Sequence, residues 1–176
     1  MEHGKYTVEL GRRLRERIES AGREDLQVFF DHGKDGESQR VVPYFGNYDL
    51  STTLAFVDLA IVNKDTKSTL VLCEVEEEGV NPKKVIGDCM NIFVSDRICV
   101  GRQPYSINNA HFLLGTKVGI KGKGGDKVKN LEARIPSLMK DEAVRGIRLE
   151  FVTAPDCKEL ISVLDAKICG ILNIRV

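Results

Sequence analysis

The sequence predicts one α/β domain in which helices flank a mixed central sheet. The chain has 176 residues, of which 42% are hydrophobic, enough for a single domain with a sizeable core. Segments with helical periodicity alternate with short apolar runs of strand length. No internal repeat or linker divides the chain, so we expect one domain over residues 1–176, with a core at about 5–116 and a C-terminal helix-strand-helix extension at about 117–176.

The N-terminal part predicts a helix followed by two short strands. Lys5–Ala21 carries apolar side chains at helical spacings, and Gly22 marks the end of this helix. Leu26–Phe30 is an apolar run of strand length. Arg40–Phe45 predicts a second strand at a sheet edge, because Pro43 cannot donate a ladder hydrogen bond.

A β-hairpin is predicted over Phe56–Glu78, the stretch around which the rest of the chain is organised. Asp58 lies inside an apolar run on its first strand, while Glu74 and Glu76 lie where the apolar run of its second strand ends. Side chains alternate along a strand, so Glu74 and Glu76 point to the same face. The hairpin therefore predicts a cluster of three carboxylates.

The turn of this hairpin sets the spacing between the acids. A turn centred on Asp65 and Thr66 places Asp58 opposite Cys73, within about one position of Glu74. Carboxylates so close raise one another's pKa or attract a cation, and oxygen ligands of this kind suit Mg²⁺ or Mn²⁺ better than Zn²⁺. Burying Asp58 without a partner is costly. The alternative interpretation is that the acids only solvate the end of a strand.

A second helix is predicted directly after the acidic strand. Asn81 caps this helix, which begins at Pro82 and runs to about Asp96. Lys83 and Lys84 occupy its first turn, where the helix dipole prefers an anion, so nearby acids or a phosphate would explain them. The apolar residues expected to be buried on this helix are Val85, Ile86, Met90, Ile92 and Phe93.

A basic, glycine-rich segment follows the next predicted strand, Ala110–Thr116. It is not a P-loop, because the pattern GxxxxGK[ST] is absent. One interpretation is a solvated loop, and the other is a basic flap that follows a phosphate backbone. The lysines of this segment are Lys117, Lys121, Lys123, Lys127 and Lys129.

The C-terminal extension predicts two helices around a strand. Leu131–Val144 has a helical pattern that Pro136 interrupts, and Ile147–Thr153 is an apolar strand. Pro155–Gly170 predicts the last helix, and Ile171–Val176 predicts a final short strand.

Composition excludes several classes of function. The 26 basic and 26 acidic residues cancel, so any surface for a polyanion is local. The apolar runs are too short to span a membrane and the first residues lack a signal-peptide core, so we expect a cytoplasmic protein. The five cysteines are widely spaced without a CxxC pair, and we expect them to be small buried hydrophobes.

We expect His111, which precedes a strand, to have a structural role and not to act as a catalytic base.

The order of these elements resembles the αβββαβ core of the PD-(D/E)xK nuclease superfamily, the restriction-endonuclease-like fold shared with archaeal Holliday-junction resolvases. The resemblance covers roughly Lys5–Thr116. Asp58 matches the family's acid on the second core strand, and Glu74-Val75-Glu76 stands at the (D/E)xK tripeptide of the third. Glu9 stands where the resolvases carry a glutamate on the first helix.

The resemblance implies a metal-dependent nuclease acting on DNA, with RNA as the second choice of substrate. In this family Asp58 and Glu74 would hold Mg²⁺ or Mn²⁺ with help from the carbonyl of Val75, and Glu9 would bind a second ion or its water. Because many nucleases of this fold dimerise, the resemblance also implies a homodimer.

One position departs from the family pattern, since Glu76 occupies the place of the lysine. Some restriction enzymes carry a glutamate there, and members with a displaced lysine supply it from the following helix, which here means Lys83 or Lys84. The same departure fits a nuclease-fold domain without catalytic activity that binds or senses nucleic acid. A third hypothesis is an unrelated α/β interaction module with structural acids.

Overall fold

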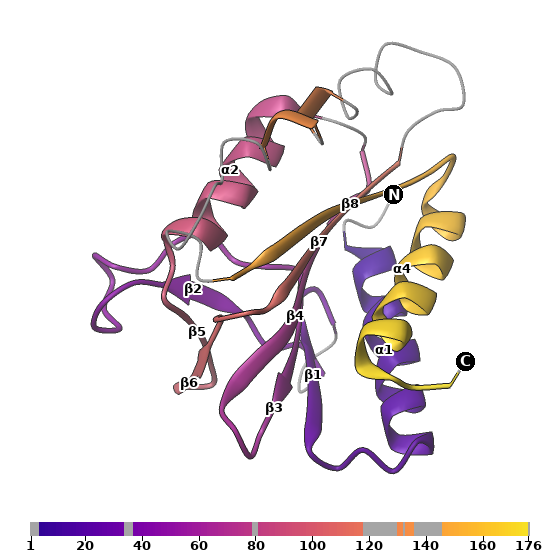
Figure 1. Ribbon diagram of the computed structural model, residues 1–176, viewed down its shortest axis with the longest axis horizontal. Coiled ribbons are helices and arrows are strands. Elements are labelled where there is room, and N and C mark those ends of the chain that lie inside the picture. The colour runs from indigo at the N-terminus through magenta and orange to yellow at the C-terminus, as the bar shows by residue number, and fades with distance from the viewer. Residues whose placement is uncertain are drawn as a thin grey trace.

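The computed structural model describes residues 4–33, 37–78, 81–117, 130–131, 133–135 and 146–175. Within these ranges its helices and strands alternate along the chain, as Figure 1 shows. They are, in order, α1 (Lys5–Ser20), β1 (Leu26–Phe30), β2 (Val42–Tyr44), β3 (Leu59–Asn63), β4 (Ser68–Glu76), α2 (Pro82–Val94), β5 (Arg97–Val100), β6 (Gln103–Ser106), β7 (His111–Lys117), β8 (Arg148–Ala154) and α4 (Cys157–Leu172).

The described strands form one mixed sheet, which confirms the predicted α/β class. Strand β3 lies between β1 and β4 and is antiparallel to both. On the other side of β4, strand β7 runs parallel to it, and β8 runs parallel to β7. Strands β4, β7 and β8 therefore end at the same edge of the sheet.

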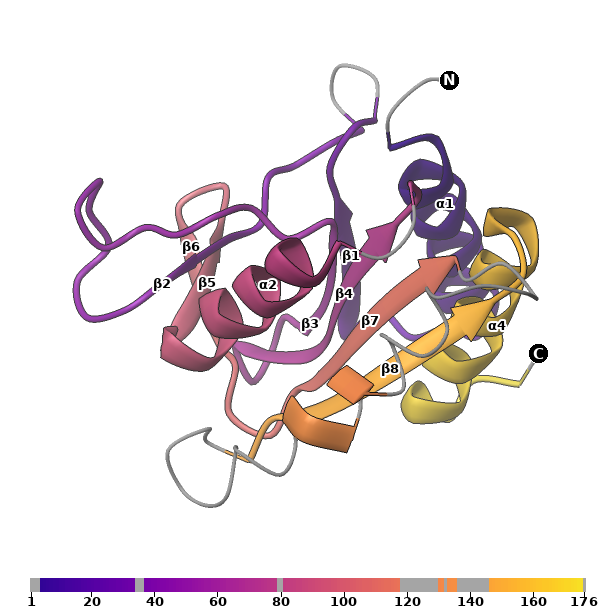
Figure 2. The ribbon, with the colours of Figure 1, turned by 90° about the horizontal axis from the view of Figure 1, so that it is seen from above.

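Helices cover both faces of this sheet (Figures 1 and 2). Helices α1 and α4 pack on one face, where Leu14 and Leu160 are buried together with Cys73 of β4. Helix α2 lies on the opposite face, where Ile92 is buried together with Leu72 of β4. Consecutive strand residues point to opposite faces, so Leu72 and Cys73 serve different cores.

Strands β5 and β6 form a hairpin that the sequence did not predict. Its two-residue turn, Gly101-Arg102, has φ values of 53° and 73°, which is the conformation of a type I′ turn. The outer strand β2 pairs with β5, whereas β6 reaches β4 only through Ser106 opposite Ser68. Strands of four residues that contain arginine and proline leave little apolar periodicity to detect.

Most of the other predicted elements are present with shifted ends. Two predictions are wrong: the burial of two residues of α2 and the short strand at the end of the chain. Ile86 and Met90 are not buried, because α2 turns Val85, Cys89 and Ile92 toward the sheet and leaves the other two 46% and 51% exposed.

The predicted final strand is wrong, since α4 continues to Leu172 and Asn173 then caps it in the left-handed conformation. Most of the predicted helix Leu131–Val144 falls outside the described residues, although residues 130–131 and 133–135 are helical. All five cysteines are free and buried, as predicted. None of the helices in the described ranges combines the length and apolar character needed to cross a membrane.

Candidate active site

A β-bulge decides which face of the sheet Asp58 occupies relative to β4. The pairing of β3 with β4 shifts by one residue between Ile61 and Val62, which leaves Leu70 without a partner across the pair. A shift of one residue exchanges the faces on which opposed side chains meet. The bulge therefore controls which side chains of β4 can meet Asp58.

The bulge places Asp58 level with Glu74. The last pair of this ladder joins Leu59 to Cys73, so the next position outward sets Asp58 against Glu74. The predicted pairing of Asp58 with Cys73 is wrong by one residue, because it counts outward from the turn without a bulge. Opposed side chains in antiparallel strands share a face, with Cβ atoms roughly 4.5–5.5 Å apart. Asp58 and Glu74 therefore share the face of Leu72, which α2 covers.

The carboxylate of Asp58 is held by the backbone of the neighbouring strand. Its Oδ2 accepts a hydrogen bond of 2.8 Å from the backbone N–H of Val75. Its Oδ1 lies 3.9 Å from Nε2 of His32, which follows the end of β1. The carboxylate is thus fixed at the margin of the sheet between two nitrogen groups.

Glu74 is a buried acid that forms no ion pair with any Lys or Arg among the described residues. Only 5% of the residue is exposed. Burial raises the pKa of Glu74 well above its ordinary value, and the negative charges of Asp58 and Asp88 raise it further, while the charge of Lys84 lowers it. Glu74 therefore favours either a proton or a cation beside it.

Lys84 supplies the positive charge that the strand lacks. Its Nζ lies 2.6 Å from Oε1 of the buried Glu76. The two groups form an ion pair, but their bond angles are not those of a hydrogen bond. Burial lowers the pKa of Lys84, but the carboxylate of Glu76 and the charges of Asp88 and Asp58 outweigh it, so that the pKa is raised overall. The ammonium group therefore remains charged at neutral pH.

Two further residues belong to this cluster and were missed from the sequence. Burial and then the charge of Glu76 raise the pKa of Asp88 to about 6, and its Oδ2 is buried without a hydrogen-bond partner in the described part of the chain. Thr116 pairs with Glu76 across β4 and β7, and its hydroxyl is also buried without such a partner. The spacing of four residues between Lys84 and Asp88 was the available signal, since such residues share a helix face.

The donors in this cluster suit a hard divalent cation. Within the described ranges, no three or more His, Cys, Asp and Glu side chains already form a metal-binding group. The carboxylates of Asp58, Glu74 and Asp88 nevertheless supply the oxygen ligands that Mg²⁺ and Mn²⁺ prefer. A cation there would offset the repulsion that raises the pKa of Glu74 and would give the buried Oδ2 of Asp88 a partner. The types of donor atom, rather than a preformed arrangement of them, therefore match such an ion.

Other predicted site residues lie elsewhere or have different partners. Glu9 is on α1, the helix of the opposite face, and pairs with Arg13. Lys83 is exposed, and its backbone N–H is capped by Asn81. Of the predicted basic segment, Lys117 ends β7 at the edge where β4 also ends. The remaining predicted lysines, Lys121, Lys123, Lys127 and Lys129, lie outside the described residues.

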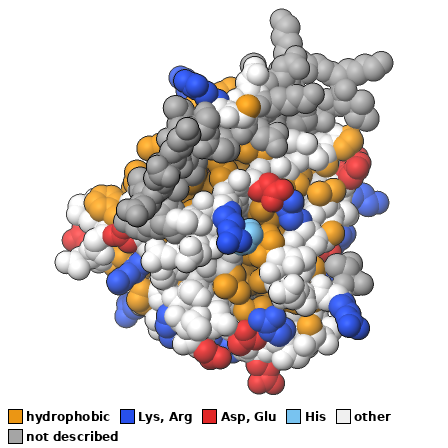
Figure 3. All heavy atoms as spheres, in the orientation of Figure 1, with side chains coloured by type: hydrophobic (Ala, Val, Ile, Leu, Met, Phe, Trp, Pro, Cys, Tyr) orange, Lys and Arg blue, Asp and Glu red, His pale blue; other side chains and the backbone are white. Residues whose placement is uncertain are grey.

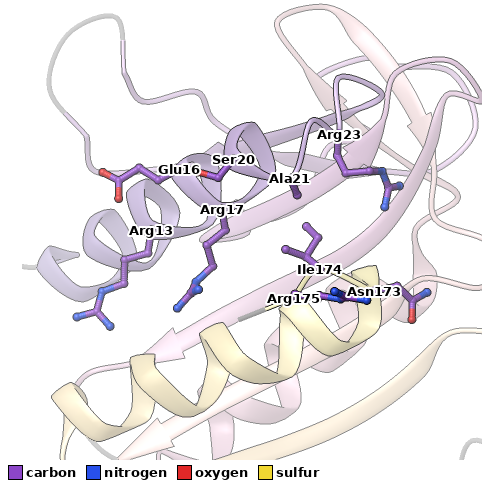
Figure 4. Close-up of a pocket in the computed structure, with 9 residues that line it drawn as sticks. All are labelled: Arg13, Glu16, Arg17, Ser20, Ala21, Arg23, Asn173, Ile174 and Arg175. Carbon is purple, nitrogen blue, oxygen red and sulfur yellow. The ribbon is translucent and has the colours of Figure 1, made fainter.

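A cavity of about 760 Å³ lies away from this cluster, between α1 and the residues after α4 (Figure 4). Four arginines line it, but Arg13 pairs with Glu9, Arg17 with Asp165 and Arg23 with Asp25. Figure 3 shows acidic and basic side chains scattered over one face without a broad patch of either sign. The acidic cluster beside α2 is therefore the better candidate for chemistry.

Comparison with protein-family models, curated proteins and solved structures finds no match to this chain.

Proposed function

We propose that this chain is a metal-dependent nuclease that hydrolyses phosphodiester bonds of DNA. The observation that carries the proposal is the convergence of Asp58 and Glu74 on one face of the sheet, beside the ion pair of Glu76 with Lys84. This is the set of groups that the resemblance to PD-(D/E)xK nucleases requires, with the lysine supplied from the helix.

The arrangement of the elements supports the same proposal. Strands β1, β3 and β4 are successively antiparallel, helix α2 follows β4, and β7 then pairs parallel to β4. With β2, β5 and β6 set aside as additions, this order is similar to the αβββαβ core, which supports the proposal. Asp58 precedes the first residue of β3, and Glu74 and Glu76 lie within the last three residues of β4, the positions at which the resemblance would put the family's acids.

Each residue of the cluster has a defined task in this proposal. A bound Mg²⁺ would supply Lewis-acid stabilisation of the phosphate and a water of lowered pKa. Asp58 and Glu74 would hold the ion, and Asp88 offers a further oxygen from α2. Glu76 positions Lys84, whose ammonium group would stabilise negative charge that develops on the phosphate.

A cleavage assay tests the proposal directly. Supercoiled plasmid, linear duplex, single-stranded and branched DNA are incubated with the protein and Mg²⁺ or Mn²⁺. We expect metal-dependent cleavage that Asp58→Ala abolishes and that Asp65→Ala, in the exposed hairpin turn, leaves intact. Cleavage that is the same with and without Asp58 would reject the assignment.

A domain that binds nucleic acid without cleaving it is the second candidate, and Glu76 in the place of the family lysine favours it. In that case DNA binding would be salt-sensitive and indifferent to Asp58 and to metal. Binding by the wild-type chain, without cleavage of any of the four substrates, would select this alternative.

A further inference from the structure

A groove on the outer side of the sheet combines exposed apolar side chains with arginines. Its volume is about 560 Å³, within the range of roughly 300–1,000 Å³ that is usual for small-ligand sites. Val42 of β2 and Cys99 of β5, which pair in the sheet, line it. We call it the Arg40–Phe56 groove and define it by Arg40, Tyr48, Leu50, Phe56 and Arg102.

The apolar part of the groove is unusually open to solvent. Tyr48 is 52% exposed and Phe56 47%, and Leu50 between them in sequence is almost fully exposed. Tyr48 also packs edge-on against Tyr44, with ring centroids 5.1 Å apart, so the strand β2 supports its ring. A cluster of large apolar side chains on a protein surface indicates a binding site for a ligand or a macromolecule.

The charge of the groove selects an anionic partner. The guanidinium carbon of Arg40 lies 4.8 Å from the ring centroid of Phe56, and Arg102 projects from the β5–β6 turn. None of the described residues that line the groove is acidic. A partner with flat aromatic groups and regularly spaced negative charges matches both features, and a nucleic-acid strand with unpaired bases has them.

One residue of the groove, Phe56, is close in sequence to the candidate active site. The backbone N–H of Val57 donates to the carbonyl of Val41 at 3.0 Å, which holds Phe56 and Arg40 together at the start of the two segments. Asp58 is two residues beyond Phe56, a separation of at most roughly 7 Å along the chain. Val42 and Cys99 alternate with Val41 and Ile98, which pack with α2, so the groove lies on the other face of the sheet from the acidic cluster and is nearest to it in sequence at Phe56.

We propose that the Arg40–Phe56 groove binds single-stranded DNA, with Phe56 as the groove residue nearest to Asp58 along the chain. Bases would stack on Phe56 and Tyr48, and phosphates would lie at Arg40 and Arg102. The inference rests on the proposed function and specifies the state of its substrate, because bases within a duplex are already stacked and cannot lie on a protein ring.

Fluorescence anisotropy with a short labelled single-stranded DNA tests this inference in EDTA, where cleavage is blocked. We expect Phe56→Ala and Arg40→Ala each to weaken binding by about tenfold, the usual loss for one stacking platform. Phe45→Ala is the matched aromatic control, because Phe45 is exposed but does not line the groove. Arg148→Ala is the arginine control, and both controls should bind like the wild type.

Several results would overturn the inference. They are equal binding by Phe56→Ala and the wild type, equal loss of duplex and single-strand binding, and tighter binding of an RNA of the same sequence. A wild-type dimer in sedimentation velocity that Phe56→Ala dissociates without altering DNA binding would assign the groove to a second copy instead.

The two proposals fail separately. Asp58→Ala should bind the labelled strand like the wild type, since Asp58 acts in cleavage. If Asp58→Ala stops cleavage while the groove variants bind normally, only the groove inference fails. If the groove variants lose binding but no metal-dependent cleavage exists, only the nuclease proposal fails.

Discussion

The ammonium nitrogen of Lys84 lies 2.6 Å from Oε1 of Glu76. Lys84 comes from the first turn of α2, while Glu76 is the last residue of β4. The helix thereby brings a positive charge to the buried acid at the end of the strand. Both of the lysines considered from the sequence are exposed, and the structure pairs Lys84 with the buried acid.

Removing Lys84 should destabilise the protein, because the buried carboxyl group of Glu76 would lose its cationic partner. We expect Lys84→Met to lower the free energy of unfolding by roughly 1–2 kcal/mol in urea denaturation. Lys83→Met is the matched control and should change it by less than about 0.5 kcal/mol. Equal effects of the two substitutions would contradict the pairing.

Divalent metal should stabilise the protein in the absence of nucleic acid. At tenfold excess over its dissociation constant, Mn²⁺ should add about 1.4 kcal/mol and raise Tm by about 3 °C, because the ion binds the folded state alone. Thermal melts of Asp58→Asn and Glu74→Gln should lack this shift, while Asp65→Asn should retain it. A shift that survives both site substitutions would place the ion elsewhere.

The buried acids should make stability fall with rising pH when metal is removed with EDTA. Burial raises the pKa of Glu74 above its ordinary 4.5 and that of Asp88 to about 6, so the folded state holds protons that the unfolded state has released. Their stabilising contribution is complete below the ordinary pKa values and is lost as pH rises through the raised ones.

Urea denaturation between pH 4 and pH 8 checks this dependence. Glu74→Gln should flatten the profile and be more stable than the wild type at pH 8, since an amide carries no charge. Exposed Glu16→Gln should leave the profile unchanged. The account would be contradicted if the free energy of unfolding of the wild type rose from pH 5 to pH 8 with a slope that Glu74→Gln does not change. The pKa of Glu74 would then not be raised by burial.

The surroundings of two helical glycines, Gly11 on α1 and Gly170 on α4, predict opposite effects of adding a side chain. A Cβ at Gly11 would collide with the ring of Phe30, whereas nothing lies within 4 Å of one at Gly170. Gly11→Ala should lower the free energy of unfolding by roughly 1–3 kcal/mol through overpacking. Gly170→Ala should raise it by about 0.5 kcal/mol, because alanine favours a helix. Chemical denaturation compares the two, and stabilisation by Gly11→Ala would contradict this packing.

Local patterns in the sequence were sufficient to predict the acidic strand and the helix that follows it. Alternation along a strand places Glu74 and Glu76 on one face, and the Asn81-Pro82 pair fixes the start of α2. Both depend on neighbouring residues alone, so no knowledge of distant contacts was needed.

Features that depend on distant contacts could not be predicted. The bulge at Leu70 moves Asp58 by one position, and a bulge has no signature in a run such as Thr69–Cys73. His32 joins the cluster only through the position of the end of β1, and the helical spacing that sets Asp88 beside Lys84 does not by itself bring Asp88 to the acids of β4. A helical pattern alone also assigned Ile86 to the core, whereas the tilt of α2 against the sheet exposes it.

The most direct measurement is anomalous diffraction from a crystal soaked in Mn²⁺ at a concentration that raises Tm. The proposal predicts a peak about 2.0–2.2 Å from carboxylate oxygens of both Asp58 and Glu74. Density that is absent between these two side chains, or a peak bound only by other residues, would contradict a metal-dependent active site at this position.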